Sequence, residues 1–535
     1  MKKARILGLL LASALLAGVF SACTPAQQAT APPTATDNSG AAATTAPAEQ
    51  PATAVTPAPE AEQRGIILAY QSETPSVAPA MHTSLVGHFM HTLTHNGLFR
   101  LEYQNLTPTP DVVESWEALS DTLFEFKLKP GIMFHNGEEM TAHDFVASFE
   151  YVRQFPFAVT VHGSIEHAEA IDDYTLHIDT GEPNAMLFFD LAHHGNWVMP
   201  RSLIEAGHDF NVDPVGTGPF VFDYWNPGDE ISFIRNDNYF DAERDPIVPY
   251  VTWRLVPEGA SRTIALEVGE VDLIVEVPFP DVQRMRDNPN ITVFDRPGLT
   301  FQSMGMNNAA FPFDNIHVRH AVDMALDKEA MVMASLDGFG IPWWQNSPPL
   351  PGSSDVGTGR FDPDASRALL QEHGLDPATL GFEALVSTEE QRRRAEVVQA
   401  NLADIGIDMT ISMTDFATQL SITQAGNHQA SFAAFTTGNL MGFLRGTMHS
   451  DSIGAQNSNF VNLPELDALI DRAIATIDES ERLAVLHEAT TLANENRGAI
   501  PTSMNILMRA YNSNLILPEI GANGFMFLNM AHWAE

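Results

Sequence analysis

Three histidines near the start of the chain have the spacing of one helix face. His88, His91 and His95 lie at positions i, i+3 and i+7, so a helix would bring their imidazoles together. Such a set could bind a metal ion, but no acidic or cysteine ligand accompanies it, and we favour a partly buried, hydrogen-bonded set. His193 and His194 are adjacent and would point oppositely on a strand, so only one, here His193, is expected to face a ligand. We predict no metal site.

The motifs that signal catalysis are absent. There is no G-x-S-x-G elbow and no cysteine beyond position 23, and no phosphate-binding loop of the G-x-x-x-x-G-K-[ST] type. The run Gly216–Phe220 has two glycines and a proline and predicts a tight turn. His487 begins an H-E-x-x-H pattern, but Thr491 stands where the second histidine would be. We therefore expect no enzyme and no cofactor, although a carboxylate pair remains open among 68 acids.

The only cysteine, Cys23, follows the only long apolar run. Lys2, Lys3 and Arg5 precede this run, which covers Ile6–Phe20, and two small residues separate it from the cysteine. The pattern is that of a secretion signal, and it resembles the signal of bacterial lipoproteins, with Cys23 as the lipid attachment point. We therefore predict a signal peptide over residues 1–22. The alternative is a plain secreted protein with an unpaired cysteine.

The segment after Cys23 has the composition of a tether. Of the 41 residues from Thr24 to Arg64, 28 are Ala, Thr or Pro and none is aromatic. Such a segment cannot bury enough apolar surface to offset its ordering entropy. We expect residues 23–64 to be a disordered, lipid-anchored tether that holds the rest of the chain away from a membrane.

The net charge and the hydrophobicity of the chain limit which kinds of partner it can bind. The 535-residue chain has a formal net charge of -40, which disfavours nucleic acid and anionic lipid as direct partners. No second apolar run approaches 18 residues, so we expect no membrane-spanning helix. The 44% hydrophobic content is typical of globular proteins.

The elements that must position any site alternate between strand and helix. Phe124–Leu128 alternates apolar and charged residues, as a half-buried strand does, and Thr141 with Asp144 predicts a capping box at a helix start. This alternation predicts an α/β fold with mixed sheets. Further expected elements are a helix over Arg262–Val268, a strand over Val271–Val277, a helix begun by Asp362, a helix ended by Gly406, a strand over Ile407–Met413, and two helices around Leu466–Ile477 and after Asp478.

Several stretches resemble one family. From Gly65 onward the chain resembles the large solute-binding proteins of ABC importers, the class with dipeptide-, oligopeptide- and nickel-binding members. Five stretches in the expected order carry the resemblance, and any one alone would be weak. They are Phe124–Val152, Asp213–Phe240, Pro249–Pro278, Met306–Val332 and Phe361–Leu375.

The resemblance implies a two-lobed fold with mixed sheets, an interlobe cleft and crossing strands that act as a hinge. By this comparison lobe I covers residues 65–299, with an inserted subdomain at about 101–205. Lobe II covers residues 300–499, and residues 500–535 return to lobe I. Phe301–Met306 would be the first crossing.

The ligand-binding residues follow from the same resemblance. In peptide-binding members an acid after a glycine-rich, aromatic loop of the second lobe pairs with the ligand's amino group. The corresponding stretch, Phe435–Ser450, contains no acid, and Asn439 stands near the expected position. Burying an ammonium without a counter-charge would cost several kcal/mol, which favours a larger, more apolar or differently charged ligand. Arg445 would either clamp a ligand carboxylate or face the surface.

Further cleft positions are expected in other segments. One of Trp343 and Trp344 would stack on a ligand, or both would cover a lobe core. The first crossing would bring Phe301 and Gln302 near the ligand. The remaining expected contacts are Met81 and His82, in the loop after the first strand.

The function implied is capture without catalysis. The chain would be a monomeric, extracytoplasmic lipoprotein that binds a peptide or similar small organic solute and delivers it to an ABC permease and its ATPase. A nickel or metal-chelate receptor is the alternative, and a secreted hydrolase is a further one.

Overall fold

The computed structural model describes residues 64–534, except 75, 80–84, 103–105, 156–161, 356, 358, 360 and 519. The chain divides into a unit of residues 1–61 and a unit of residues 62–535, and all described residues belong to the second. The predictions for Cys23, the tether, Met81 and His82 lie outside the described residues.

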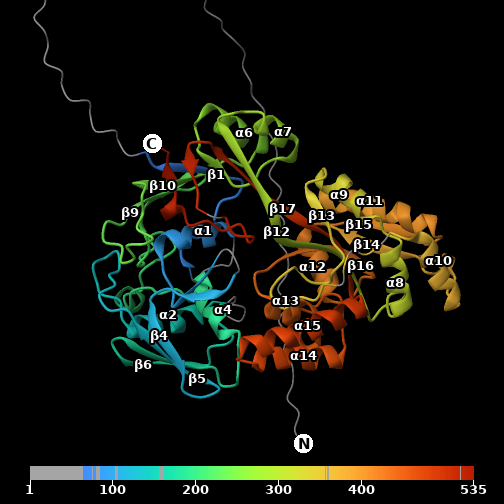
Figure 1. The fold of residues 1–535 in the computed structure, drawn as a ribbon, viewed down its shortest axis with the longest axis horizontal. Coiled ribbons are helices and arrows are strands. Elements are labelled where there is room, and N and C mark those ends of the chain that lie inside the picture. The colour runs from blue at the N-terminus through green and yellow to red at the C-terminus, as the bar shows by residue number, and fades with distance from the viewer. Residues whose placement is uncertain are drawn as a thin grey trace, which may run out of the picture. The chain divides into compact units, whose positions relative to one another are not determined.

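An 11-stranded sheet runs through the described unit in the order β15-β14-β16-β12-β17-β11-β1-β10-β9-β8, with β13 paired to β17 (Figure 1). It is mixed: β1 is parallel to β10 and β11, and β14 is parallel to β15 and β16, whereas β12 and β17 are antiparallel. The strands are β1 (Ile66–Tyr70), β8 (Phe220–Asn226), β9 (Glu230–Arg235), β10 (Tyr250–Leu255), β11 (Leu273–Ile274), β12 (Ile291–Met306), β13 (Gly340–Pro342), β14 (Phe382–Val386), β15 (Met409–Met413), β16 (Ala430–Thr436) and β17 (Ala499–Asn512).

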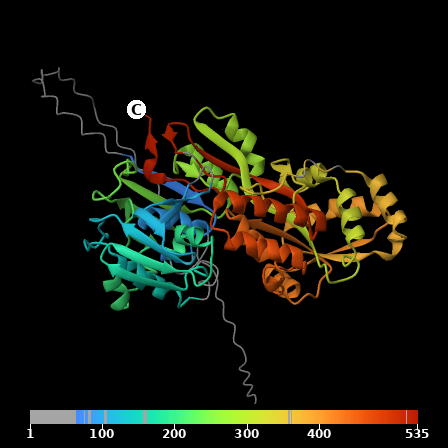
Figure 2. The same cartoon turned by 60° about the horizontal axis from the view of Figure 1, so that its bottom comes forward.

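The two long strands β12 and β17 connect two separate hydrophobic cores. Ile291 of β12 packs with Met508 and Ala510 of β17 in one core, while Met306 of β12 packs with Ile500 of β17 in another. Figure 2 shows the same two strands passing between the halves of the unit. The fold is therefore two-lobed. We call the part around β1 and β8–β11 lobe I and the part around β14–β16 lobe II.

Lobe I also carries a smaller sheet and several short helices. The sheet has the order β4-β5-β7-β6, and two further pairs join β2 to β3 and β18 to β19. The strands are β2 (Phe99–Leu101), β3 (Pro108–Pro110), β4 (Val113–Ala118), β5 (Leu123–Leu128), β6 (His167–Asp172), β7 (Thr175–Asp179), β18 (Leu515–Ile516) and β19 (His532–Trp533). The helices are α1 (Leu85–Thr94), α2 (Ala142–Val152), α4 (Leu187–Ala192), α5 (Arg201–Glu205), α6 (Gly259–Val268) and α7 (Val282–Arg286).

The local expectations for this part are largely confirmed. Strand β5 buries Phe124, Phe126 and Leu128 on one face. Helix α2 begins with the predicted capping box, since Thr141 and Asp144 satisfy each other's backbone groups. The helix ended by Gly269 is also present as α6.

Lobe II is built from longer helices around its end of the sheet. They are α8 (Ile316–Met324), α9 (Lys328–Leu336), α10 (Pro363–Glu372), α11 (Glu389–Asp404), α12 (Phe416–Gln424), α13 (Leu440–Met448), α14 (Pro464–Ala475) and α15 (Glu479–Asn496). The predicted caps are confirmed, because Asp362 accepts from the N–H of Ala365 and Asp478 from that of Glu481. Among the helices of the described ranges, none is both long and apolar enough to cross a membrane.

One local expectation needs correction. The strand predicted over Val271–Val277 is only Leu273–Ile274, and just beyond it the carbonyl of Val275 accepts from the Arg509 guanidinium. At the turn predicted for Gly216–Phe220 the chain bends at residues 217–219, without a positive φ at Gly216 and Gly218. The two glycines are needed because their backbone presses on the end of α1: a Cβ at Gly216 would lie 2.2 Å from the carbonyl oxygen of Thr94.

Candidate functional site

The carboxyl ends of the parallel strands in the two lobes face a common cavity. Open α/β sheets bind ligands at such ends. Residues just after β11 in lobe I, Glu390 after β14, and Thr436 at the end of β16 line one cavity of about 400 Å³. We call it the crossing cavity, because the middle parts of β12 and β17 form its remaining wall. Its lining is Val275–Val277, Phe279, Gly298–Thr300, Glu390, Thr436, Asn505–Arg509, Ala522 and Asn523.

A fixed polar network backs the lobe II side of the crossing cavity. Arg394, which is fully buried, donates to Oε1 of Glu390 at 2.7 Å and to Oε1 of Gln302 at 2.9 Å. Gln302 in turn donates to Asn505 at 3.2 Å. Burial lowers the pKa of Arg394, and the charge of Glu390 opposes this change. The network therefore holds Glu390 and Asn505 at the wall.

The lobe I side contains a half-buried glutamate, Glu276, and a buried arginine, Arg509. Both terminal nitrogens of Arg509, a residue only 2% exposed, donate to the backbone carbonyls of Val275, Met508 and Gly524. Half-buried Glu276 lines the same cavity. Burial raises the pKa of Glu276, while the charges of Arg509 and Arg262 act in the opposite direction.

A second cavity, of about 300 Å³, is lined in lobe I by residues of β2, β3, β4 and α4 and in lobe II by the start of α13, the start of α15 and nearby loops. We call it the aromatic cavity, since Phe99, Trp116, Phe188 and Phe189 line its lobe I side. Its full lining is Phe99, Leu106–Pro108, Pro110, Trp116, Ala185, Phe188, Phe189, Leu350, Pro351, Gly438–Met441, Ile477, Glu479, Arg482, Leu483 and Leu486. A cavity of this kind suits the apolar part of a ligand.

The loop at the end of β16 contributes to both cavities. Thr436 lines the crossing cavity and Gly438–Met441 line the aromatic one. Asn439 is the N-cap of α13: its Oδ1 accepts from the backbone N–H groups of Met441 at 3.0 Å and Gly442 at 3.3 Å. Its Nδ2 lies 3.4 Å from the sulfur of Met186. The predicted position near a ligand is thus an aromatic-cavity position that also caps a helix.

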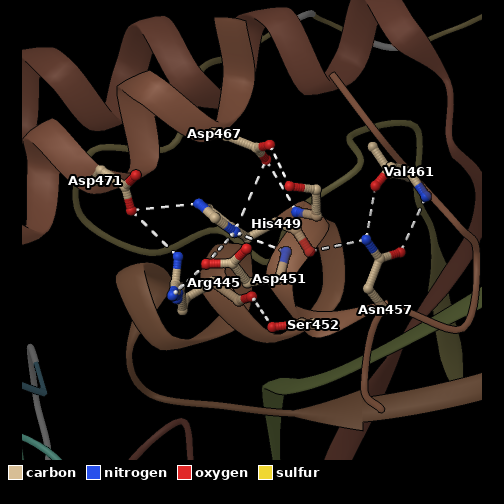
Figure 3. Close-up of polar contacts among 9 residues, drawn as sticks. Arg445, His449, Asp451, Ser452, Asn457, Val461, Asp467 and Asp471 are labelled. Atoms are coloured by element: carbon tan, nitrogen blue, oxygen red, sulfur yellow. Dashed lines mark hydrogen bonds and ion pairs between the residues drawn. The ribbon is translucent and has the colours of Figure 1, made fainter. Parts of the chain in front are cut away.

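Arg445 lies away from both cavities, on the outward side of α13. Its guanidinium pairs with Asp451 and Asp471, each at 3.2 Å, and Figure 3 shows these carboxylates around it together with His449. The side chain is 39% exposed. Its charge is therefore already balanced within lobe II, and a role in clamping a ligand stays a prediction.

The other predicted contacts lie behind the cavity walls. Phe301 is buried and meets Phe443 edge-on, with ring centroids 5.9 Å apart, and Gln302 belongs to the network described above. Trp343 donates to the carbonyl of Ser347 at 2.9 Å, and the Trp344 ring lies 5.7 Å from the ammonium of Lys328. These four residues line neither cavity, although Leu350 and Pro351 of the following loop line the aromatic one.

The histidines are packed inside lobe I. His193 follows the end of α4 and accepts from the N–H of Gly195, so His193 and His194 do not lie on a strand. Nδ1 of His88 lies 2.8 Å from Nδ1 of His194. Burial lowers the pKa of His193 to about 4. Within the described ranges no group of three or more His, Cys, Asp or Glu side chains is arranged to hold a metal ion.

Sequence reasoning missed several lining residues. Glu276 and Asn505 lie on segments more than 200 positions apart, and Trp116 and Phe188 belong to different elements of lobe I. One signal was available for Glu276, because an acid directly after a buried apolar strand often lies at a sheet's carboxyl edge.

Comparison with known proteins places the whole described unit. The family model of bacterial extracellular solute-binding proteins, family 5 (middle region), matches residues 107–451, which is more than half of the chain. Heme-binding protein A of Haemophilus influenzae is 27% identical over 451 residues, covering 77% of this chain and 82% of that protein. The dipeptide-binding protein of Escherichia coli is 25% identical over 447 residues, covering 76% and 82%.

Solved structures agree in fold. HbpA2 of Haemophilus parasuis superposes with a TM-score of 0.80 at 21% identity, covering 88% of this chain and all of that one. The nickel ABC transporter structure from Bacillus halodurans gives 0.74 at 25% identity, covering 87% and 99%. These matches confirm the resemblance found in the five sequence stretches. The chain belongs to the family 5 extracellular solute-binding proteins, which act outside the cytoplasm as non-catalytic binding components of ABC importers.

Proposed function

We propose that the chain captures a peptide or similar small organic solute between lobes I and II and delivers it to an ABC permease. The observation that carries the proposal is that segments of both lobes line each of the two cavities. A ligand that contacts both lobes favours the conformation in which those contacts form together. The closed form is then the one that docks on the permease.

The crossing strands supply the natural hinge for this motion. Strands β12 and β17 are the long connections between the two cores, so bending them reorients the lobes without disturbing either core. On this basis we keep the boundaries 65–299, 300–499 and 500–535 for lobe I, lobe II and the return to lobe I, with the subdomain at about 101–205.

The two cavities favour an organic solute with an apolar part. Aromatic side chains line one cavity and polar groups the other, a combination that suits peptides of mixed character. The similarity to a dipeptide-binding protein supports the same class. A metal chelate is the second candidate, supported by the nickel transporter structure from Bacillus halodurans; a chelate would bring most of its metal ligands with it.

We also propose that Cys23 carries a lipid and that residues 24–64 tether a monomeric binding unit to the outer face of a membrane. Such a tether raises the effective concentration of the protein near its permease. Metabolic labelling with a radioactive fatty acid tests this. Label should enter the wild-type protein and be absent from Cys23→Ser, and equal labelling of the two would contradict the anchor.

A thermal-shift screen tests the receptor function. The panel contains di- to octapeptides, sugars and nickel–histidine chelates. A true ligand present at 100 times its Kd stabilises the folded form by about 2.7 kcal/mol, which raises Tm measurably. Stabilisation by peptides alone supports the first candidate, and stabilisation by the chelates alone supports the second. Turnover of any member would point to the hydrolase instead.

A further inference from the structure

Two glutamates line the crossing cavity, one from each lobe. Glu276 follows β11 of lobe I, and Glu390 lies in the first turn of α11 of lobe II. We infer that this cavity receives a positively charged group of the solute, an ammonium or guanidinium, which lies between Glu276 and Glu390. The inference rests on the proposed function and names the chemical class of its ligand.

Each carboxylate keeps an oxygen free for a ligand. Both contacts of Glu390 with described residues, from Arg394 and from Gln302, go to its Oε1, so none of the residues that the structure describes donates to Oε2. Glu276 makes no hydrogen bond and no ion pair within 4.0 Å to any residue that the structure describes. The free acceptors therefore come from both lobes.

The cation that lines this cavity is not placed to bind an anion. Arg509 is buried, and its two terminal nitrogens are bound to three backbone carbonyls. The hydroxyl groups of Thr300 and Thr436 bond each other at 2.9 Å. The charged groups of the lining that keep a free, accessible hydrogen-bonding atom are thus the two glutamates, beside the side-chain amides of Asn505 and Asn523, and carboxylates match a donor-rich cation.

The arrangement also couples the charge of the ligand to lobe closure. Two carboxylates that approach each other as the lobes close repel, and burial already raises the pKa of Glu276. A cation between them removes the repulsion and attracts both walls. This supplies the counter-charge that the Phe435–Ser450 loop lacks, where Asn439 instead caps a helix. The net charge of -40 adds a long-range attraction for cationic solutes.

The test compares paired solutes on matched variants of the purified protein. Each peptide or amine is titrated by calorimetry alongside its N-acetylated counterpart. The variants are Glu276→Gln and Glu390→Gln, and the controls are Glu270→Gln in lobe I and Glu383→Gln in lobe II, both exposed acids outside the cavities. Circular dichroism checks that each variant is folded.

We expect the wild-type protein to bind the amine-bearing form at least tenfold more tightly than the acetylated form. Glu276→Gln should lose at least tenfold in affinity for the amine and little for the acetylated form, and the controls should match wild type. The same selective loss is expected for Glu390→Gln. Because that change also removes a partner of Arg394, Glu276→Gln is the decisive variant.

Three results would overturn the inference in distinguishable ways. If Glu276→Gln bound both forms as wild type does, the cation would lie elsewhere. If it lost affinity equally for both forms, Glu276 would be a structural partner of Arg509. If the wild-type protein bound only acetylated or anionic solutes, the cavity would not take a cation while the receptor function stood. Absence of binding by any solute would overturn the receptor function as well.

Discussion

Replacement of Asn439 tests its role as the N-cap of α13, where it also lines the aromatic cavity. In Asn439→Ala, the N–H groups of Met441 and Gly442 lose the oxygen that accepts from them. Loss of a helix cap of this type costs about 1 kcal/mol of the free energy of unfolding. In Asn439→Asp the accepting oxygen is kept, and a negative charge at the helix N-terminus contributes about 0.3–1 kcal/mol. We therefore expect a loss only for the alanine variant.

The assay combines urea unfolding with amide hydrogen exchange. The midpoint in urea should fall for Asn439→Ala at unchanged slope, since a lost cap changes stability and not the surface exposed on unfolding. Exchange at Met441 and Gly442 should become faster in the same variant and stay near wild type in Asn439→Asp. Equal destabilisation of the two variants, or unchanged exchange in Asn439→Ala, would refute the capping role.

Two further predictions concern stability. Gly218→Ala should lower the free energy of unfolding by about 3 kcal/mol or more, because its Cβ would lie 2.4 Å from the backbone carbon of Thr94 and backbone cannot move aside; thermal denaturation measures this. Stability should also fall as pH drops from 6.5 toward 4. Burial lowers the pKa of His95 to about 3 and that of His135 and His193 to about 4, so the unfolded chain binds more protons than the folded one in this window, at most about 1.4 kcal/mol per pH unit for each histidine.

Controls accompany both predictions. Gly442→Ala places its Cβ 3.5 Å from a Met186 methyl carbon, an ordinary contact inside α13, and should stabilise the helix by up to about 1 kcal/mol; a loss like that of Gly218→Ala would contradict the packing argument. Burial raises the pKa of Asp190 to about 6. The stabilisation from protonated Asp190 is lost as pH rises through about 6. As pH falls from 6 toward 4, this stabilisation therefore offsets the loss of stability due to one of the three histidines. Constant stability from pH 6.5 to 4 would contradict the assignment of neutral buried histidines.

The sequence was sufficient to predict those elements that depend on residues close together in the chain. The Thr141–Asp144 box, the Asp478 cap and the alternation of β5 depend on residues a few positions apart. It failed where distant segments decide the outcome. Strand β11 covers only two residues, and the carbonyl of Val275 just beyond it binds Arg509, 234 positions away in sequence.

The candidate site shows the same limit. Asn439 was expected near the ligand because Phe435–Ser450 resembles the glycine-rich, aromatic loop of the family, and the structure places it at the aromatic cavity. For Arg445 the sequence left two roles open, and it could not show the contact with Asp471, 26 positions further on. Glu276 and Glu390 come from different lobes, and no local pattern brings them together.

Small-angle X-ray scattering with and without a saturating ligand tests the central claim most directly. The account predicts that the radius of gyration falls when a solute identified by the thermal screen binds, since lobes I and II close on it about β12 and β17. An unchanged scattering profile at full saturation would contradict capture by lobe closure.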